Sequence, residues 1–245
     1  GLNNQKLREY GAKQKFYKGI PEIFEKTKHM FKDDTTYSEY GIQVEHYIVS
    51  TGFAEIIRGS RLMPFVDGIW GCELLETPDA EGNPVIGEVL YTIDNTTKTR
   101  AIFEINKGIG KIEGIEVNSK VPKANRRVHF ENMIYIADGP SDIPAFSVVK
   151  QNGGATFAIY PKGDLKAMKQ VEQMLAGILR HAEDADVPPA AAAAFDDVAV
   201  VGREAGGQHI VDLRGRTIKI FSKLVAFELG SVLLVEQFID ELLNV

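Results

Sequence analysis

The sequence predicts an α/β protein in which a parallel sheet is flanked by helices. Two short apolar runs, at 44–53 and 134–137, each lead through a turn directly into a segment with helical spacing of apolar residues. Of the 245 residues 44% are hydrophobic, which is enough to bury one good core. We divide the chain into a core of residues 1–186 and a C-terminal segment of residues 187–245, which we expect to pack on the core sheet.

The expected elements follow from periodicity and turn residues. Helical patterns at 3–12 and 21–31 precede a strand at 46–50, and the helical pattern AEIIRG follows that strand. A strand, turn and strand at 69–92 carry the turn sequence AEGNPVIG at their centre. The other expected elements are a helix that begins near Lys98, a long polar loop, strands at 133–137 and 155–161, a helix at 165–185 and an apolar helix within 217–245.

Asp138 and Asp142 lie in the turn DGPSD that follows the 134–137 strand. The carboxyl ends of parallel strands are where ligands bind in open α/β sheets, and hard divalent cations take carboxylate oxygens as ligands. These two residues therefore predict a magnesium site. The alternative is conformational: Asp142 caps the next helix, Pro144 lies in its first turn and Asp138 forms an Asx turn.

Two other segments carry groups suited to an anion. Ser50 ends the 46–50 strand, and Thr51 and Gly52 follow it before the helical pattern begins. A hydroxyl with free backbone N–H groups before a helix forms a phosphate cradle. Their alternative role is a simple helix cap. Lys98 lies just inside a helix start, where the helix dipole disfavours a cation, so this position favours an anion-holding role over that of a solvated lysine.

In this order along the chain, Ser50 with Thr-Gly-Phe, Lys98 at a helix start, and Asp138 with Asp142 after a strand, the sequence resembles the haloacid-dehalogenase-like (HAD-like) phosphohydrolase superfamily. The resemblance covers roughly residues 15 to 165. It implies a HAD-like Rossmannoid sheet with the remnant of a helical cap at the N-terminus. It also implies that Ser50 and Lys98 hold the phosphoryl group, that Asp138 binds Mg²⁺, and that Asp142 assists the metal directly or through water. The family's fourth motif usually opens with Gly, whereas this chain has Ala137.

The family's first motif, Asp-x-Asp, is not found before residue 46. Its first carboxylate attacks phosphorus and forms an aspartyl-phosphate. We expect the nucleophile either upstream of residue 1 or replaced by Asp212 in HIVDLRGRT, where Arg214 stands in place of the second acid and cannot shuttle protons near neutral pH. Because the family's first strand lies between the strands of Ser50 and Asp138, we expect 198–201 or 209–212 to fill that central slot.

Composition narrows the function classes. A net charge of −6 argues against a nucleic-acid binder, and one cysteine, Cys72, fits a reducing, cytoplasmic location. The sequence has no apolar run of about 18 residues, so we expect no membrane span. The expected partners are a small phosphorylated metabolite and, through the apolar helix within 217–245, a second copy of the chain. Two classes stay open: a magnesium-dependent phosphohydrolase, and an inactive binding or interaction module with the same fold.

Overall fold

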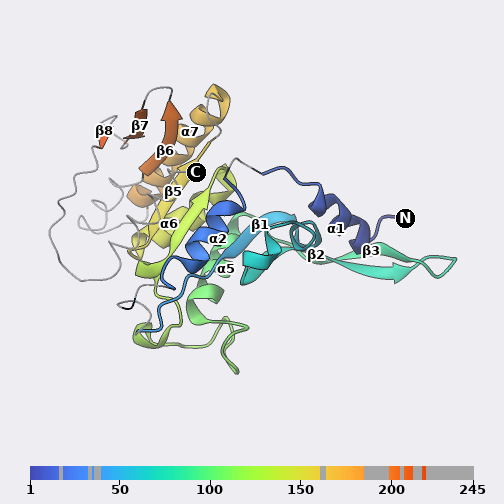
Figure 1. The fold of residues 1–245 in the computed structure, drawn as a ribbon. Coiled ribbons are helices and arrows are strands. Elements are labelled where there is room, and N and C mark those ends of the chain that lie inside the picture. The colour runs from blue at the N-terminus through green and yellow to red at the C-terminus, as the bar shows by residue number, and fades with distance from the viewer. Residues whose placement is uncertain are drawn as a thin grey trace. The chain divides into compact units, whose positions relative to one another are not determined.

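A computed structural model describes residues 1–16, 19–32, 35, 40–160, 164–184, 199–204, 207–211 and 217–218 (Figure 1). These residues form an α/β protein, as the sequence predicts. They divide into two compact units between Asp94 and Asn95, within the span predicted as one core, and each unit is described by itself. No helix in the described part of the chain has the length and apolar character needed to cross a membrane.

The first unit contains a mixed sheet of three strands in the order β1-β2-β3. Strand β1 (Tyr47–Phe53) runs parallel to β2 (Gly68–Pro78), which forms a long antiparallel hairpin with β3 (Pro84–Tyr91) (Figure 1). The helices of this unit are α1 (Asn4–Ala12), α2 (Glu22–His29) and α4 (Ala54–Arg58). These elements confirm the expected helices at 3–12 and 21–31, the strand at 46–50 and the hairpin at 69–92.

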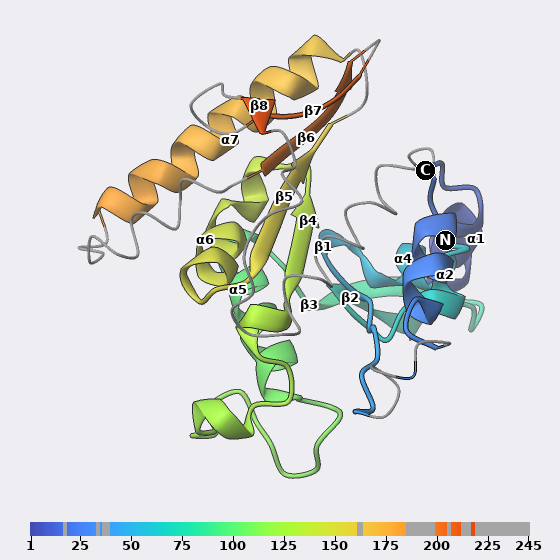
Figure 2. The ribbon, with the colours of Figure 1, turned by 60° about the vertical axis from the view of Figure 1, so that its left-hand side comes forward.

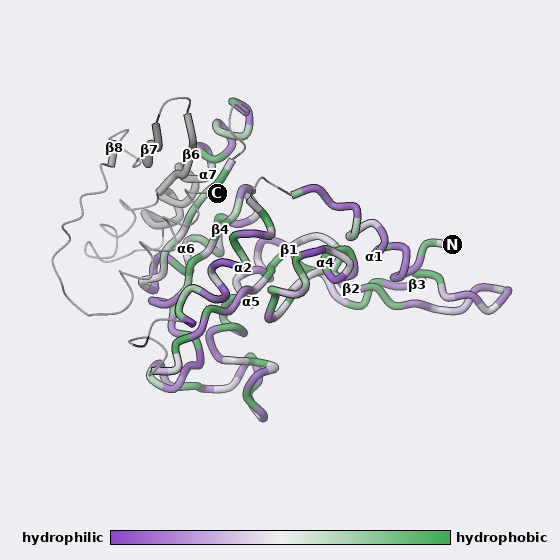
Figure 3. The backbone as a smooth tube through the Cα atoms, viewed as in Figure 1, coloured by the Kyte–Doolittle hydropathy of each residue, from purple (hydrophilic) through white to green (hydrophobic). Residues whose placement is uncertain are grey.

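Helix α1 is held against α4 by close backbone contact. A Cβ atom added to Gly11 would lie 2.0 Å from the carbonyl oxygen of Ile56, and one added to Gly59 would lie 2.0 Å from that of Arg8. Hydrophilic residues predominate along α1, so this contact does not depend on a broad apolar face (Figure 3). Two glycines therefore set the distance between the helices.

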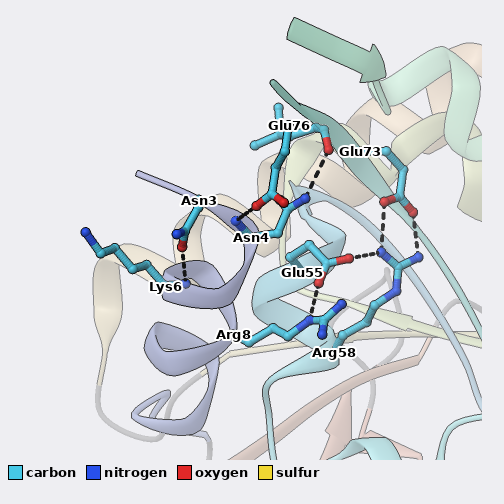
Figure 4. Close-up of polar contacts among 9 residues, drawn as sticks. Asn3, Asn4, Lys6, Arg8, Glu55, Arg58, Glu73 and Glu76 are labelled. Carbon is cyan, nitrogen blue, oxygen red and sulfur yellow. Dashed lines mark hydrogen bonds and ion pairs between the residues drawn. The ribbon is translucent and has the colours of Figure 1, made fainter. Parts of the chain in front are cut away.

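Charged side chains add to the same contact (Figure 4). Glu55 of α4 accepts hydrogen bonds from Arg8 of α1 and from Arg58, and Arg58 forms two bonds of 2.6 and 2.8 Å with Glu73 of β2. The guanidinium fork matches a carboxylate with two parallel bonds, which fixes geometry as well as charge. The network joins α1, α4 and β2.

A histidine joins α2 to the segment before β1. His46 Nδ1 lies 3.0 Å from the carbonyl oxygen of Phe65, so this nitrogen carries the proton, and Nε2 lies 2.8 Å from the hydroxyl of the fully buried Thr27. The backbone N–H of His46 donates to Asp67, which also forms an ion pair with Lys28. Burial lowers the pKa of His46 from its ordinary value of 6.5, and the nearby charge of Lys28 acts in the same direction.

The second unit is built from two successive strand–helix–strand connections. Strand β4 (Ile134–Ala137) is followed by α6 (Ile143–Gln151) and then by β5 (Ala155–Ile159), which pairs with β4 in parallel. Helix α7 (Leu165–Asp184) leads to β6 (Ala199–Glu204), which pairs with β5 in parallel. Figure 2 shows α6 and α7 along one face of this sheet, where Phe146, Ala158, Val171 and Met174 form a buried cluster.

The C-terminal strands do not lie next to β4, in the central position expected for 198–201 or 209–212. The sheet has the order β4-β5-β6-β7-β8, so β6 lies beyond β5 and away from β4. The reason is the crossover: α7 carries the chain from β5 to the neighbouring parallel position, as βαβ connections do. Strand β7 (Gly207–Val211) then pairs with β6 in antiparallel orientation, and β8 (Thr217–Ile218) pairs with β7. The rest of the predicted closing helix within 217–245 lies outside the described residues.

The polar segment between α5 (Asn95–Lys107) and β4 is tied to the end of that helix. The ammonium group of Lys107 donates to the carbonyl oxygens of Val117 and Ser119, and the side chain of the buried Asn106 donates to the carbonyl of Val128 at 2.6 Å. An exposed ion pair between Lys123 and Glu131 lies in the same segment. The Lys107 and Asn106 contacts satisfy backbone carbonyls in a segment without strands.

Candidate functional site

The candidate site of the second unit begins where β4 ends. Asp138 follows the strand and is exposed, and the backbone N–H of Asp142 donates to the carbonyl of Gly139 at 3.0 Å, which closes a 3₁₀ turn (Pro140–Asp142). Gln170 of α7 donates to the backbone carbonyl of Asp138 at 3.2 Å. The turn is thereby held from two sides, and Asp142 becomes the buried residue at its end.

Lys98 and Asp142 form a buried ion pair. Lys98 Nζ lies 2.7 Å from Asp142 Oδ1 and 3.0 Å from the hydroxyl oxygen of Ser141, and the two charged side chains are 5% and 7% exposed. Lys98 is the fourth residue of α5, so the predicted placement of a cation just inside a helix start is confirmed. The carboxylate compensates both the unfavourable helix dipole and the loss of hydration.

A third side chain reaches the same carboxylate oxygen. The hydroxyl of Tyr135, on β4, donates to Asp142 Oδ1 at 2.6 Å, while Ser141 Oγ donates to Oδ2 at 3.3 Å. Burial raises the pKa of the Tyr135 phenol, and the negative charge and hydrogen bond of Asp142 raise it further, because phenolate would lie beside carboxylate. Tyr135 is therefore a hydrogen-bond donor throughout the physiological pH range.

The capping interpretation of Asp142 is wrong for its side chain. Asp142 occupies the N-cap position of α6, and Pro144 lies in the first turn as expected, but the carboxylate makes no capping hydrogen bond. Its oxygens bind Lys98, Tyr135 and Ser141 instead. The orientation of the Asp142 carboxylate is therefore set by Lys98 of α5 and not by the backbone N–H groups of α6.

The residues predicted to cradle phosphate lie in the first unit. Ser50, Thr51 and Gly52 belong to β1, which continues through Phe53 directly into α4. The hydroxyl oxygen of Ser50 accepts from the backbone N–H of Gly52 at 3.0 Å, and Thr51 and Gly52 are exposed. That these residues share one pocket with Lys98 stays a prediction, because it depends on how the two units are arranged.

Two residues of this cluster, Tyr135 and Ser141, are not predicted by the sequence patterns above. Tyr135 stands in the apolar run IYIA, which predicts a buried strand. The signal was present, because a buried tyrosine hydroxyl almost always needs a hydrogen-bond partner. Asp212, the alternative nucleophile, lies outside the described residues; Val211 before it pairs with Val200, near the amino end of β6.

Comparisons with known proteins give one relative of unassigned activity. An uncharacterized protein of Borreliella burgdorferi is 35% identical to this chain over 181 residues, which cover 69% of the chain and 61% of that protein. The chain thus spans less than two thirds of the length of this relative. No protein-family model matches the chain, and no solved structure matches it.

Proposed function

We propose that the chain carries the metal- and phosphate-binding part of a magnesium-dependent phosphohydrolase that acts on a small phosphorylated metabolite. The observation that carries the proposal is the buried Lys98–Asp142 pair at the carboxyl end of β4. Burying a cation and its partner costs desolvation free energy and adds little to stability, so such a pair is better explained by a chemical role.

The donor set fits magnesium. Within the described residues, no group of three or more His, Cys, Asp or Glu side chains could hold a metal ion. Magnesium needs only one or two protein carboxylates and completes its octahedron with waters and phosphate oxygens. Asp138 and Asp142 offer carboxylate oxygens four residues apart, and among the described residues Asp142 Oδ2 accepts only the long 3.3 Å bond from Ser141.

Each residue then has a distinct role. Asp138 would bind the ion, and Asp142 would assist through Oδ2 or through a water while Oδ1 holds Lys98. The lysine ammonium has three donors, two of which are used by Asp142 and Ser141, so within the described part of the chain one is left for a phosphate oxygen. Ser50, Thr51 and Gly52 keep the phosphate-binding role expected from the sequence. The ion would supply positive charge against the charge that develops on the phosphoryl group.

Titration of Mg²⁺ into the full chain, followed by calorimetry, tests this proposal. Asp138→Asn should abolish binding, whereas Asp142→Asn should weaken it less if that contact runs through water. Asp79→Asn serves as the matched control, since Asp79 is a partly exposed turn carboxylate between β2 and β3 in the first unit. Undiminished Mg²⁺ affinity in both site variants, or no binding by the unaltered chain, would overturn the proposal.

The second candidate is an inactive binding module, and one observation favours it. Asp142 Oδ1 is already shared between Lys98 and Tyr135, so Lys98 is held in place by protein groups alone. Hydrolysis of p-nitrophenyl phosphate in the presence of Mg²⁺ separates the two candidates. Turnover that is lost in Lys98→Met supports the enzyme, and binding of inorganic phosphate without any turnover supports the module.

A further inference from the structure

Tyr135 reaches the proposed site through its hydrogen bond to Asp142. Its hydroxyl lies 2.6 Å from Asp142 Oδ1, and its ring packs edge-on against Phe146, with ring centroids 5.3 Å apart and an interplanar angle of 82°. Phe146 is fully buried, so the ring of Tyr135 rests against a part of α6 that cannot yield. The hydroxyl is therefore presented from a fixed direction.

The carboxylate of Asp142 needs such an anchor. The terminal torsion of an aspartate is broad, and this carboxylate makes no capping bond with the helix that follows it. Lys98 alone does not distinguish the two oxygens, because an ammonium group can bind either. Two donors on Oδ1, one from α5 and one from β4, keep Oδ1 turned inward and leave Oδ2 for Ser141.

We infer that Tyr135 is a positioning residue, which orients the Asp142 carboxylate so that Oδ1 holds Lys98 while Oδ2 faces the turn of Asp138. This inference rests on the magnesium site proposed above. A neutral donor suits the task, because it fixes the carboxylate without neutralising it, as hydrogen-bond partners of metal ligands commonly do. The competing explanation is that the Tyr135 hydroxyl merely takes the nearest acceptor and contributes to stability alone.

The test is the Mg²⁺ affinity of Tyr135→Phe, measured by calorimetry on the full chain. Losing a partner that orients a metal-binding carboxylate typically weakens metal affinity by about 10- to 100-fold, and we expect a loss in that range. In an Asp142→Asn background the same change should have no further effect, because the amide has no metal-binding orientation left to lose. The free energy of unfolding of each variant is measured alongside by urea titration.

Phe103→Leu is the matched control. Phe103 forms an edge-on ring pair with Phe130 in the same unit, with centroids 5.5 Å apart, and its replacement leaves the Tyr135–Phe146 contact and the Asp142 carboxylate unchanged. It should lower stability and leave the Mg²⁺ affinity within about twofold of the unaltered chain, in keeping with a purely packing effect. If Tyr135→Phe lowers stability yet binds Mg²⁺ as the unaltered chain does, the positioning role is refuted while the metal site stands. If the unaltered chain binds no Mg²⁺, the proposed function fails as well. Should Tyr135→Phe unfold, Tyr135→Met measured at lower temperature makes the same comparison.

Discussion

Lys98→Met is the sharpest test of the buried pair. The substitution keeps an unbranched side chain of similar length and removes the ammonium that lies 2.7 Å from Asp142 Oδ1. The carboxylate, 7% exposed, is then buried without its cation. Removing one partner of a buried pair costs about 3 to 5 kcal/mol. Tyr135 and Ser141 still donate to the carboxylate, which places the expected loss near the lower end, at about 3 kcal/mol.

Amide hydrogen exchange resolves this loss in the unit that carries the pair. A change of about 3 kcal/mol corresponds to roughly 100-fold faster exchange in α5 and α6, since every 1.4 kcal/mol is a factor of ten. Urea unfolding should show the midpoint lowered by about 1 to 3 M for a typical slope of unfolding free energy on urea concentration. Adding Asp142→Asn to Lys98→Met removes the uncompensated charge and should recover part of the loss.

Lys111→Met is the control, because Lys111 is an exposed lysine of the same unit. Its effect should stay within about 0.5 kcal/mol, as for other surface substitutions. If Lys98→Met gives no more than this, the pair behaves like a solvated surface ion pair. Burial would then cost this pair little, and the main support for its chemical role would be refuted.

Two other predictions concern the first unit. In Gly11→Ala the added methyl group would lie 2.0 Å from the carbonyl oxygen of Ile56, so α1 should separate from α4 at a cost of about 1 to 3 kcal/mol. The amides of α1 should then lose protection against hydrogen exchange, and unchanged protection would contradict the close contact. The pKa of His46 in the folded protein lies below its ordinary value of 6.5, so between these two pKa values the unfolded chain binds more protons than the folded one. The contribution of His46 to the free energy of unfolding should therefore be fully present above pH 6.5 and be lost as the pH drops through the folded pKa. Urea titrations followed by Trp70 fluorescence measure this, and His46→Gln should flatten the pH dependence; an equal slope in both proteins would assign it elsewhere.

Local sequence patterns were sufficient for the elements that carry the site. The apolar run before Asp138 forms β4, the residues with helical spacing around Lys98 form α5, and β5 lies within the segment ATFAIYP. In each case residues within one turn or one strand determine the outcome, through side-chain periodicity and turn residues. The α/β class followed from the same signals.

The errors concern partners that are distant in the sequence. Lys98 and Asp142 are 44 residues apart, and no periodicity states that their side chains meet or that Tyr135 joins them. The tail was misplaced because the position of β6 depends on which edge of β5 the crossover helix reaches, which is a property of the assembled sheet. The common pocket of Ser50 and Lys98 stays a prediction, since it requires the arrangement of two units.

Two of the contacts that hold the segment between α5 and β4 differ in their response to salt. Lys123 and Glu131 are exposed ion-pair partners, and dissolved ions screen such pairs strongly at high ionic strength. Lys107 binds the carbonyl oxygens of Val117 and Ser119, which are neutral dipoles and offer no net charge to screen. Concentrated salt should therefore weaken the Lys123–Glu131 pair and leave the Lys107 contacts in place.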